Sequence, residues 1–195
     1  MDITYLLNRK TVKNFLPDPV PEEIIQNALH IAWRSPTAVN SRPVRIYDIT
    51  GKQNADWLSV RQAPQTAKRL FLLCFSQEEA ERNMRTFLTQ KFETTERDMR
   101  IEETLNIFLR FRSQDFCREQ AHVVAGYFSS ALEIQGVAGC WISGFDKQKA
   151  KDDLKIPGDI TPEAIYACGY ANPQNPGTCE TDFVRSFENF YTPAA

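Results

Sequence analysis

The sequence predicts a single layered domain, of α/β or α+β class, with helices on both faces of a sheet. Residues 70–75 and 164–169 are apolar without alternation, which is typical of central strands that are covered on both faces. Segments with helical spacing of their apolar residues lie between and around these two runs. A chain of 195 residues has room for one well-buried core, so we expect one domain over residues 1–195, with an extended tail at 173–195.

The first part of the chain predicts two helices and a strand. Residues 2–8 are expected to form a short helix with its apolar residues on one face. A second helix begins at Pro21, whose ring suits the first helical position, and two glutamates follow in the first turn. This helix ends near Trp33, because Pro36 pushes the residue before it out of the helical region. A strand is expected at residues 44–49.

The middle and later parts predict further helices around one short strand. Residues 78–112 are highly charged and carry apolar residues at helical spacing, so we expect surface helices with one packed face. Residues 115–135 form a helix that is apolar on nearly all sides and is therefore expected to be deeply buried. Its small residues, such as Gly126, would let another helix approach closely, either from this chain or from a second copy. A strand over 139–145 precedes a helix that Asp146 caps.

The composition excludes several classes of function. Acidic and basic residues are interleaved and the net charge is −2, so we expect no nucleic-acid surface and no polybasic membrane anchor. No apolar run is long enough for a membrane span and no signal-peptide pattern is present, so the predicted location is cytoplasmic. The five cysteines include no C-x-x-C pair, which predicts buried reduced thiols. With only His30 and His122 available, we expect no metal site.

Residues 9–13, with the sequence Arg-Lys-Thr-Val-Lys, place three cations and a hydroxyl within one short segment. Such a cluster suits a phosphate, because phosphate offers enough oxygens for a guanidinium, an ammonium and a hydroxyl together. The alternative is a solvated basic turn at a helix end. A loop at residues 35–43, rich in short hydroxyl and amide side chains, is either a binding loop or an ordinary helix-to-strand connection.

The usual protein-borne catalysts are absent from the sequence. It contains no G-x-S-x-G elbow, no G-x-x-x-x-G-K-[ST] phosphate loop, no G-x-G-x-x-G motif and no H-E-x-x-H motif. A phosphate held by side chains, with no evident nucleophile or base beside it, indicates a phosphorylated cofactor that carries the chemistry itself. Flavin mononucleotide (FMN) fits this description. Pyridoxal phosphate fits less well, because no particular lysine stands out as its Schiff-base partner.

Several segments together resemble the FMN-dependent nitroreductase family in order and spacing. The resemblance spans about residues 3–172, and the segments are residues 9–15, 21–24, 35–43, 139–146, 154–157 and 169–170. It implies a three-layer α-β-α sandwich of α+β class with a mixed, mainly antiparallel central sheet. It also implies an intertwined homodimer that exchanges helices and termini and holds FMN at each of two interface sites.

The resemblance implies cofactor contacts within the basic segment. Arg9 and Thr11 resemble phosphate and ribityl contacts, and Lys10 lies beside them in the same run. Lys13 resembles the cation near N1 and the C2 carbonyl of the flavin. In that position a fixed ammonium stabilises the negative charge that builds along N1–C2=O when hydride arrives at N5.

The remaining implied contacts come from three other parts of the chain. Ser143 and Gly144 resemble the pair that passes along the flavin, and Arg185 resembles the C-terminal basic residue that completes the phosphate site. We expect a contact to the flavin ring from the middle of the chain, at Arg61 or Gln62 near the start of the second strand. The loop that the other subunit contributes corresponds to Pro36, Thr37, Ala38 and Asn40.

The implied activity is a ping-pong transfer of hydride. NADH or NADPH reduces FMN and leaves, and an electron-poor acceptor such as a nitroaromatic or a quinone then takes the electrons. FMN carries this chemistry, and no side chain is expected to be catalytic. One alternative is a narrower reaction of reduced flavin, such as dehalogenation or flavin destruction. Another is a flavin-binding redox sensor or reservoir without turnover, which is motivated by departures from common family residues at Lys10, Ala38 and Ser143.

Overall fold

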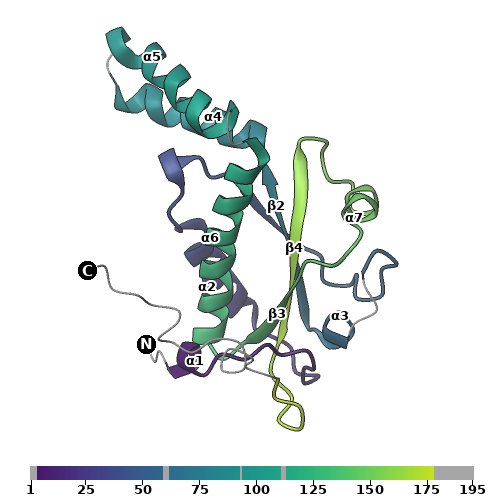
Figure 1. Cartoon of the computed structure of the whole chain (residues 1–195). Coiled ribbons are helices and arrows are strands. Elements are labelled where there is room, and N and C mark those ends of the chain that lie inside the picture. Colours follow the sequence, from purple (N-terminus) through teal and green to yellow (C-terminus); the bar gives the residue numbers. More distant parts are fainter. Residues whose placement is uncertain (1–3, 59–61, 93, 111–112, 178–195) are drawn as a thin grey trace, which may run out of the picture.

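A four-stranded antiparallel sheet forms the centre of the chain. The computed structural model describes residues 4–58, 62–92, 94–110 and 113–177 (Figure 1). The strands lie in the order β1-β2-β4-β3, and each neighbouring pair is antiparallel. Their bounds are β1 Val44–Asp48, β2 Arg69–Ser76, β3 Ala138–Ile142 and β4 Ile160–Gly169. The predicted α+β class and the mainly antiparallel sheet are therefore confirmed.

Strands β2 and β4 occupy the two central positions, as their apolar sequences predicted. Every residue of β2 after Arg69 is buried, because both faces of this strand are covered. The register between β2 and β4 shifts between Leu73 and Cys74. In the described part of the chain, parallel pairing is limited to an isolated bridge between Thr11 and Gly139.

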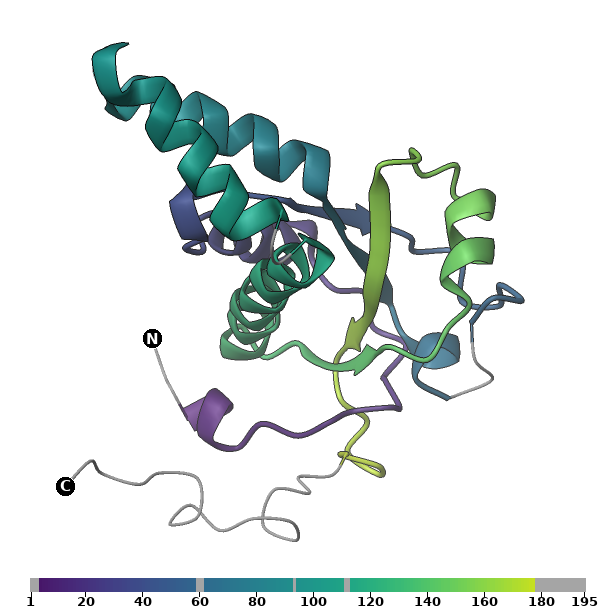
Figure 2. The ribbon, with the colours of Figure 1, turned by 45° about the horizontal axis from the view of Figure 1, so that its top comes forward.

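Helices lie against both faces of the sheet (Figures 1 and 2). On one face, Phe128 of the long helix α6 packs edge-on against Phe71 of β2 and near Tyr166 of β4. On the other face, Ala63 and Ala150 of two short helices pack against apolar side chains of β2 and β4. The helices are α1 Thr4–Leu7, α2 Glu22–Trp33, α3 Gln62–Thr66, α6 Ser113–Ile134 and α7 Lys147–Asp153. The three-layer sandwich and the homodimer stay predictions.

The highly charged middle of the chain forms a helical hairpin that projects beyond the sheet (Figures 1 and 2). It consists of α4 (Gln77–Lys91) and α5 (Thr94–Leu105), followed by a π-helical turn at Asn106–Arg110. Ser76 caps α4, because its hydroxyl accepts a hydrogen bond of 3.1 Å from the backbone N–H of Glu79. Helical structure in this region was predicted and is confirmed.

Helix α6 differs from its prediction on one face. Val123 is 39% exposed and Tyr127 is 44% exposed, so the helix is not deeply buried in the single chain. Gly126 lies between them and is also exposed, and a Cβ added there would meet no atom within 4 Å. The prediction was wrong because apolar periodicity indicates that a face is covered, and does not indicate whether the same chain covers it.

The cysteines within the described residues have buried side chains, as predicted. They are Cys74, Cys117, Cys140 and Cys168, and the fifth cysteine, Cys179, lies outside the described residues. Burial raises the pKa of the Cys74 and Cys168 thiols to about 12, so these groups stay protonated near neutral pH. None of the helices described is both long and apolar enough to cross a bilayer.

Replacement of Gly139 by alanine should destabilise the fold strongly. A Cβ at this position would lie 2.3 Å from the ring of Tyr166, which is 1% exposed and cannot move aside without disturbing the core. We expect a loss of about 1–3 kcal/mol or more in the free energy of unfolding, measured by chemical denaturation. Gly158→Ala is the matched control, because a Cβ there meets nothing within 4 Å. Equal stability of the two variants would contradict the prediction.

Candidate functional site

The basic segment at residues 9–13 lies along the free edge of β3. The backbone N–H of Val12 donates a hydrogen bond of 3.1 Å to the carbonyl of Gly139, and Thr11 pairs with the same glycine. The exposed cations of the segment are Arg9, Lys10 and Lys13. None of the three forms an ion pair with another residue that the structure describes. The backbone is therefore fixed while the charges remain available to an anion.

Two hollows lie beside Arg9. The larger has a volume of 340 Å³ and lies between β3, β4 and α6. The smaller has a volume of 210 Å³ and includes Lys10 and residues at the end of α6. Arg9 and Glu133 line both hollows. The polar groups of the larger hollow belong to Arg9, Thr11, Ser129, Glu133 and Tyr166.

Ser143 and Gly144 lie at the other end of the same strand. Both are exposed and follow β3 directly. Because a strand rises about 3.3 Å per residue, Ser143 lies about 13 Å along the chain from Gly139, where Thr11 is bound. Lys13 is held near α3, since its carbonyl accepts a hydrogen bond of 3.4 Å from the Thr66 hydroxyl. The structure thus arranges the basic segment and the Ser143–Gly144 pair along one edge strand.

The loop at residues 35–43 is held by hydrogen bonds at a different place. The backbone N–H of Ala38 donates to the side-chain oxygen of Gln120 at 2.9 Å. The N–H of Arg42 donates to the Thr37 hydroxyl at 3.2 Å, and the Arg42 side chain donates to Asn40 at 2.6 Å. Pro36 is exposed. These contacts fix the loop against the N-terminal half of α6.

The two groups of predicted contacts do not meet within one chain. Gln120, which holds the loop, and Glu133, which faces Arg9, are both residues of α6. With a rise of about 1.5 Å per residue, they lie about 20 Å apart along the helix. The loop and the hollow beside Arg9 therefore adjoin opposite halves of α6.

Glu133 is a feature of this site that the sequence analysis missed. The residue is 8% exposed, and burial raises the pKa of its carboxyl group to about 7, although the nearby charge of Arg9 acts in the opposite direction. The hydroxyl of Tyr166 is buried and has no hydrogen-bond partner among the described residues, and burial together with Glu133 raises its pKa. The available signal was one acidic residue inside an apolar helical run, between Leu132 and Ile134.

The nitroreductase family matches the chain over residues 6–170. This chain belongs to the nitroreductase family. Among proteins of known activity, it is similar to an NADH dehydrogenase of Thermus thermophilus, with 23% identity over 86% of this chain and 85% of that protein. It is also similar to an iodotyrosine deiodinase of Thermotoga neapolitana, with 22% identity over 93% of this chain and 95% of that protein.

Solved structures share the nitroreductase fold with this chain. A proposed nitroreductase of Bacillus subtilis superimposes with a TM-score of 0.84 at 14% identity, over 98% of this chain and 97% of that one. A proposed nitroreductase of Exiguobacterium sibiricum, solved in complex with FMN, superimposes with a TM-score of 0.76 at 15% identity, over 96% and 98% of the two chains. At these identities the likeness concerns the fold.

Three of the residues that the resemblance to nitroreductases implied cannot be placed. Arg61 and Arg185 lie outside the described residues, and so does the side chain of Gln62. Gln62 begins helix α3, whereas we expected it near the start of the second strand, which begins at Arg69. That expectation was wrong because α3 is too short for a helical period to show in its sequence.

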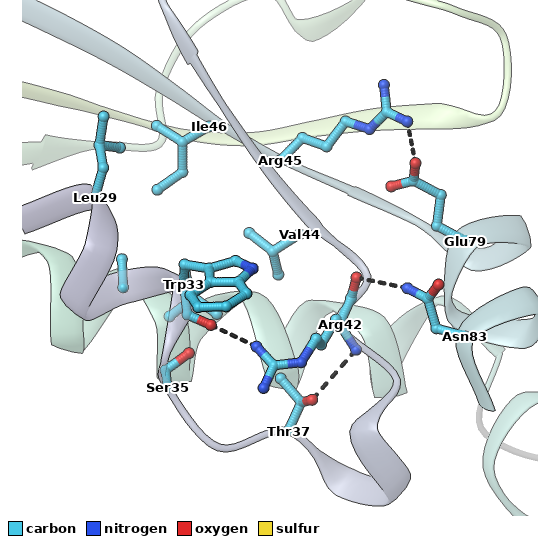
Figure 3. Close-up of a pocket in the computed structure, with 12 residues that line it drawn as sticks. Leu29, Trp33, Ser35, Thr37, Arg42, Val44, Arg45, Ile46, Glu79 and Asn83 are labelled. Atoms are coloured by element: carbon cyan, nitrogen blue, oxygen red, sulfur yellow. Dashed lines mark hydrogen bonds and ion pairs between the residues drawn. The ribbon is translucent and has the colours of Figure 1, made fainter. Parts of the chain in front are cut away.

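A cavity of 440 Å³ in this nitroreductase-family chain lies away from the basic segment (Figure 3). It is bounded by α2, β1, α4, α6 and the loop, and Thr37 is the predicted site residue that lines it. The guanidinium of Arg42 lies 5.5 Å from the centre of the Trp33 ring at its mouth. None of the cations at residues 9–13 lines this cavity.

Proposed function

We propose that the protein is an FMN-dependent oxidoreductase that transfers hydride from NADH or NADPH to electron-poor acceptors such as nitroaromatics or quinones. The observation that carries this proposal is the row of cations at residues 9–13, which form no ion pair within the described residues and are fixed to the edge of β3 by the Thr11–Gly139 bridge. The family, the NADH dehydrogenase relative and the FMN-bound neighbour support it.

The donor groups at this edge suit the chemistry of FMN. Arg9, Lys10 and Thr11 offer charged and hydroxyl donors for a phosphate and a ribityl chain. Ser143 and Gly144, about 13 Å along β3, leave room between them and Arg9 for an extended cofactor. Arg185 would complete the phosphate site. Its place in the sequence supports this role, and the cofactor would lie along the exposed strand edge.

The proposed active form is a homodimer whose flavin sites combine both subunits. Within one chain, Gln120 beside the loop and Glu133 beside Arg9 lie about 20 Å apart along α6, which supports a second copy as the source of the loop. The residues concerned are Pro36, Thr37, Ala38 and Asn40. The exposed apolar face of α6 around Val123 and Tyr127 supports the same assembly, because it leaves apolar surface that a second copy would cover.

In the proposed reaction the protein binds the cofactor, orients it and provides positive charge beside it. FMN, when bound, accepts hydride from the nicotinamide donor and passes it to the acceptor. Lys13 has no ion-pair partner in the described chain, so its ammonium can stabilise negative charge on the cofactor. Donor and acceptor use one open site in turn. No side chain is required to move a proton, since water can supply it.

A narrower activity of the reduced cofactor, such as dehalogenation, is the second candidate. The similarity to an iodotyrosine deiodinase over 93% of the chain favours it. The projecting α4–α5 hairpin is the element that would have to close over a specific substrate (Figure 2). An iodinated phenol such as iodotyrosine, offered as the electron acceptor, separates this candidate from the broader one.

Anaerobic titration of the purified protein tests the proposed function. We expect a yellow dimer that NADH or NADPH bleaches and that a quinone or nitroaromatic reoxidises, followed by absorbance. A yellow protein that neither nucleotide reduces would contradict the enzyme and favour a flavin sensor or reservoir. A colourless monomer that cannot be reconstituted with FMN would contradict flavin binding altogether.

A further inference from the structure

Three glutamates are buried in the described chain, and one of them lacks a counterion. Glu79 pairs with Arg45 and Arg82, and Glu163 pairs with cations from α6 and α7. Glu133 is as buried as Glu79, at 8% exposure, yet its carboxylate has no hydrogen bond or ion pair within the described part. A buried carboxylate without a partner is costly when ionised, so this position requires an explanation.

The groups around Glu133 come from every element that packs against it. Arg9 lies beside it in both hollows, and Lys10 and Tyr5 line the smaller one. Tyr166 of β4 and Cys140 of β3 line the larger one. The Tyr166 hydroxyl is buried, has no hydrogen-bond partner and lines this same hollow. The site therefore contains the buried hydroxyl of Tyr166 and the largely buried Glu133, and neither has a hydrogen-bond partner in the described part of the chain.

We propose that Glu133 is a positioning residue that makes cofactor binding depend on proton concentration through Arg9. In its neutral form the carboxyl group leaves Arg9 available to the cofactor phosphate. In its ionised form it competes with the phosphate for Arg9 and repels the phosphate directly. This inference rests on the proposed function, since it takes the phosphate of FMN as the ligand of Arg9.

Electrostatics gives the direction of this effect. Two negative groups beside one guanidinium repel each other, and the repulsion is strong in a partly buried site because solvent screens it weakly. Binding of the phosphate therefore favours the neutral form of Glu133. By linkage, affinity for FMN falls as the pH rises through the range in which Glu133 ionises.

The position of that range follows from the burial of the group. Burial raises the pKa of the Glu133 carboxyl to about 7, from a usual value of 4.5, and Arg9 only partly opposes this shift. A raised pKa means that the ionised form is scarce below about pH 6 and dominant above about pH 8. The switch therefore operates across neutral pH.

The test is a titration of the apo protein with FMN, followed by flavin fluorescence, for the wild type and for Glu133→Gln. We expect the ratio of the wild-type Kd to the variant Kd to rise about tenfold between about pH 6 and about pH 8. The phosphate of FMN also ionises near pH 6, which strengthens binding as pH rises, but it does so equally in both proteins. Glu79→Gln is the matched control for a buried glutamate. The ratio of the wild-type Kd for FMN to the Kd of this variant should not change with pH.

Two further measurements separate the possible failures. Riboflavin lacks the phosphate, so its Kd ratio between wild type and Glu133→Gln should not change with pH. A change equal to that seen with FMN would overturn the proposal, because Glu133 would then act on the ring or on the fold. Inorganic phosphate is used as a competitor of FMN, and its affinity for the wild type relative to Glu133→Gln should show the same pH dependence as that of FMN. A ratio that does not change with pH would also overturn the proposal.

Thermal unfolding of the apo protein tests the ionisation of Glu133 without any cofactor. The folded pKa lies above the unfolded one, so the stability due to this group is full at low pH and is lost as pH rises through about 7. Glu133→Gln should therefore gain in Tm relative to the wild type between about pH 6 and about pH 8, and a constant difference would contradict the proposal. If FMN binds and its Kd depends on pH in the same way in the wild type and in Glu133→Gln, the role of Glu133 is wrong while the proposed function stands. If neither protein binds FMN at any pH, the proposed function fails with it.

Discussion

Replacement of Tyr127 by glutamate should convert the proposed homodimer into monomers and release most of the bound FMN. Tyr127 is 44% exposed on α6 and lies with Val123 on the face that the single chain leaves uncovered. A carboxylate at the centre of such a contact would lose its hydration without gaining a partner, which costs several kcal/mol for each copy. Flavin loss follows, because the loop at residues 36–40 would no longer reach the Arg9 hollow of the partner. Sedimentation velocity and the flavin absorbance of the purified protein measure both effects.

Two variants control for this substitution. Tyr127→Phe keeps the apolar ring and should remain a flavin-bound dimer. Met99→Glu adds the same charge at another exposed apolar position, which is 64% exposed on the projecting hairpin, and should also remain dimeric. A Tyr127→Glu protein that stays dimeric and yellow would exclude this face of α6 as the interface.

Much of the fold could be predicted because its strongest determinants are local in sequence. The unbroken apolar runs of β2 and β4 indicated central strands, and both occupy the centre of the sheet. The segment from Pro21 to Trp33 carried its own start and stop signals, and α2 has those bounds within one residue. Such features need no knowledge of the rest of the chain.

The features that the sequence did not predict depend on contacts between distant segments or between chains. The exposure of Tyr127 is an example, because an apolar helix face has the same sequence whether its own chain or a partner covers it. The raised pKa of the Glu133 carboxyl is another, since it arises from burial of this residue near the end of α6. The bridge between Thr11 and Gly139 joins residues that are far apart in the sequence. Only Glu133 has a local signal, as an acidic residue inside an apolar helical run, and that signal does not indicate its burial or its nearness to Arg9.

The predicted site residues fall into two groups for the same reason. Arg9, Thr11 and Ser143 lie along one edge strand, where a cluster of cations could be recognised from a single short segment. The loop with Thr37 and Asn40 adjoins the other half of α6, and a role for it in the proposed site would involve a second copy. The sequence resemblance alone assigned the loop to the partner, and the geometry of one chain supports that assignment.

Replacement of Arg9 by alanine should lower the affinity for FMN by about 10- to 150-fold. A charge-assisted hydrogen bond to phosphate contributes about 1.5–3 kcal/mol, and Arg9 has no other ion-pair partner in the described chain that would keep it from the phosphate. Fluorescence titration of the apo protein measures the loss. Arg100→Ala is the matched control, because Arg100 lies on α5 and pairs only at the surface with Glu103. If Arg9→Ala bound FMN with unchanged affinity, the assignment of the phosphate to this edge of the sheet would be wrong.

The double variant distinguishes how Arg9 and Glu133 are related. If Glu133 acts through Arg9, the effect of Glu133→Gln on FMN affinity at about pH 8 should shrink once Arg9 is alanine, because competition for the guanidinium is gone. Direct repulsion between the carboxylate and the phosphate would persist in the Arg9→Ala background. The part of the pH effect that disappears thus measures competition for Arg9, and the part that remains measures the repulsion between the two anions.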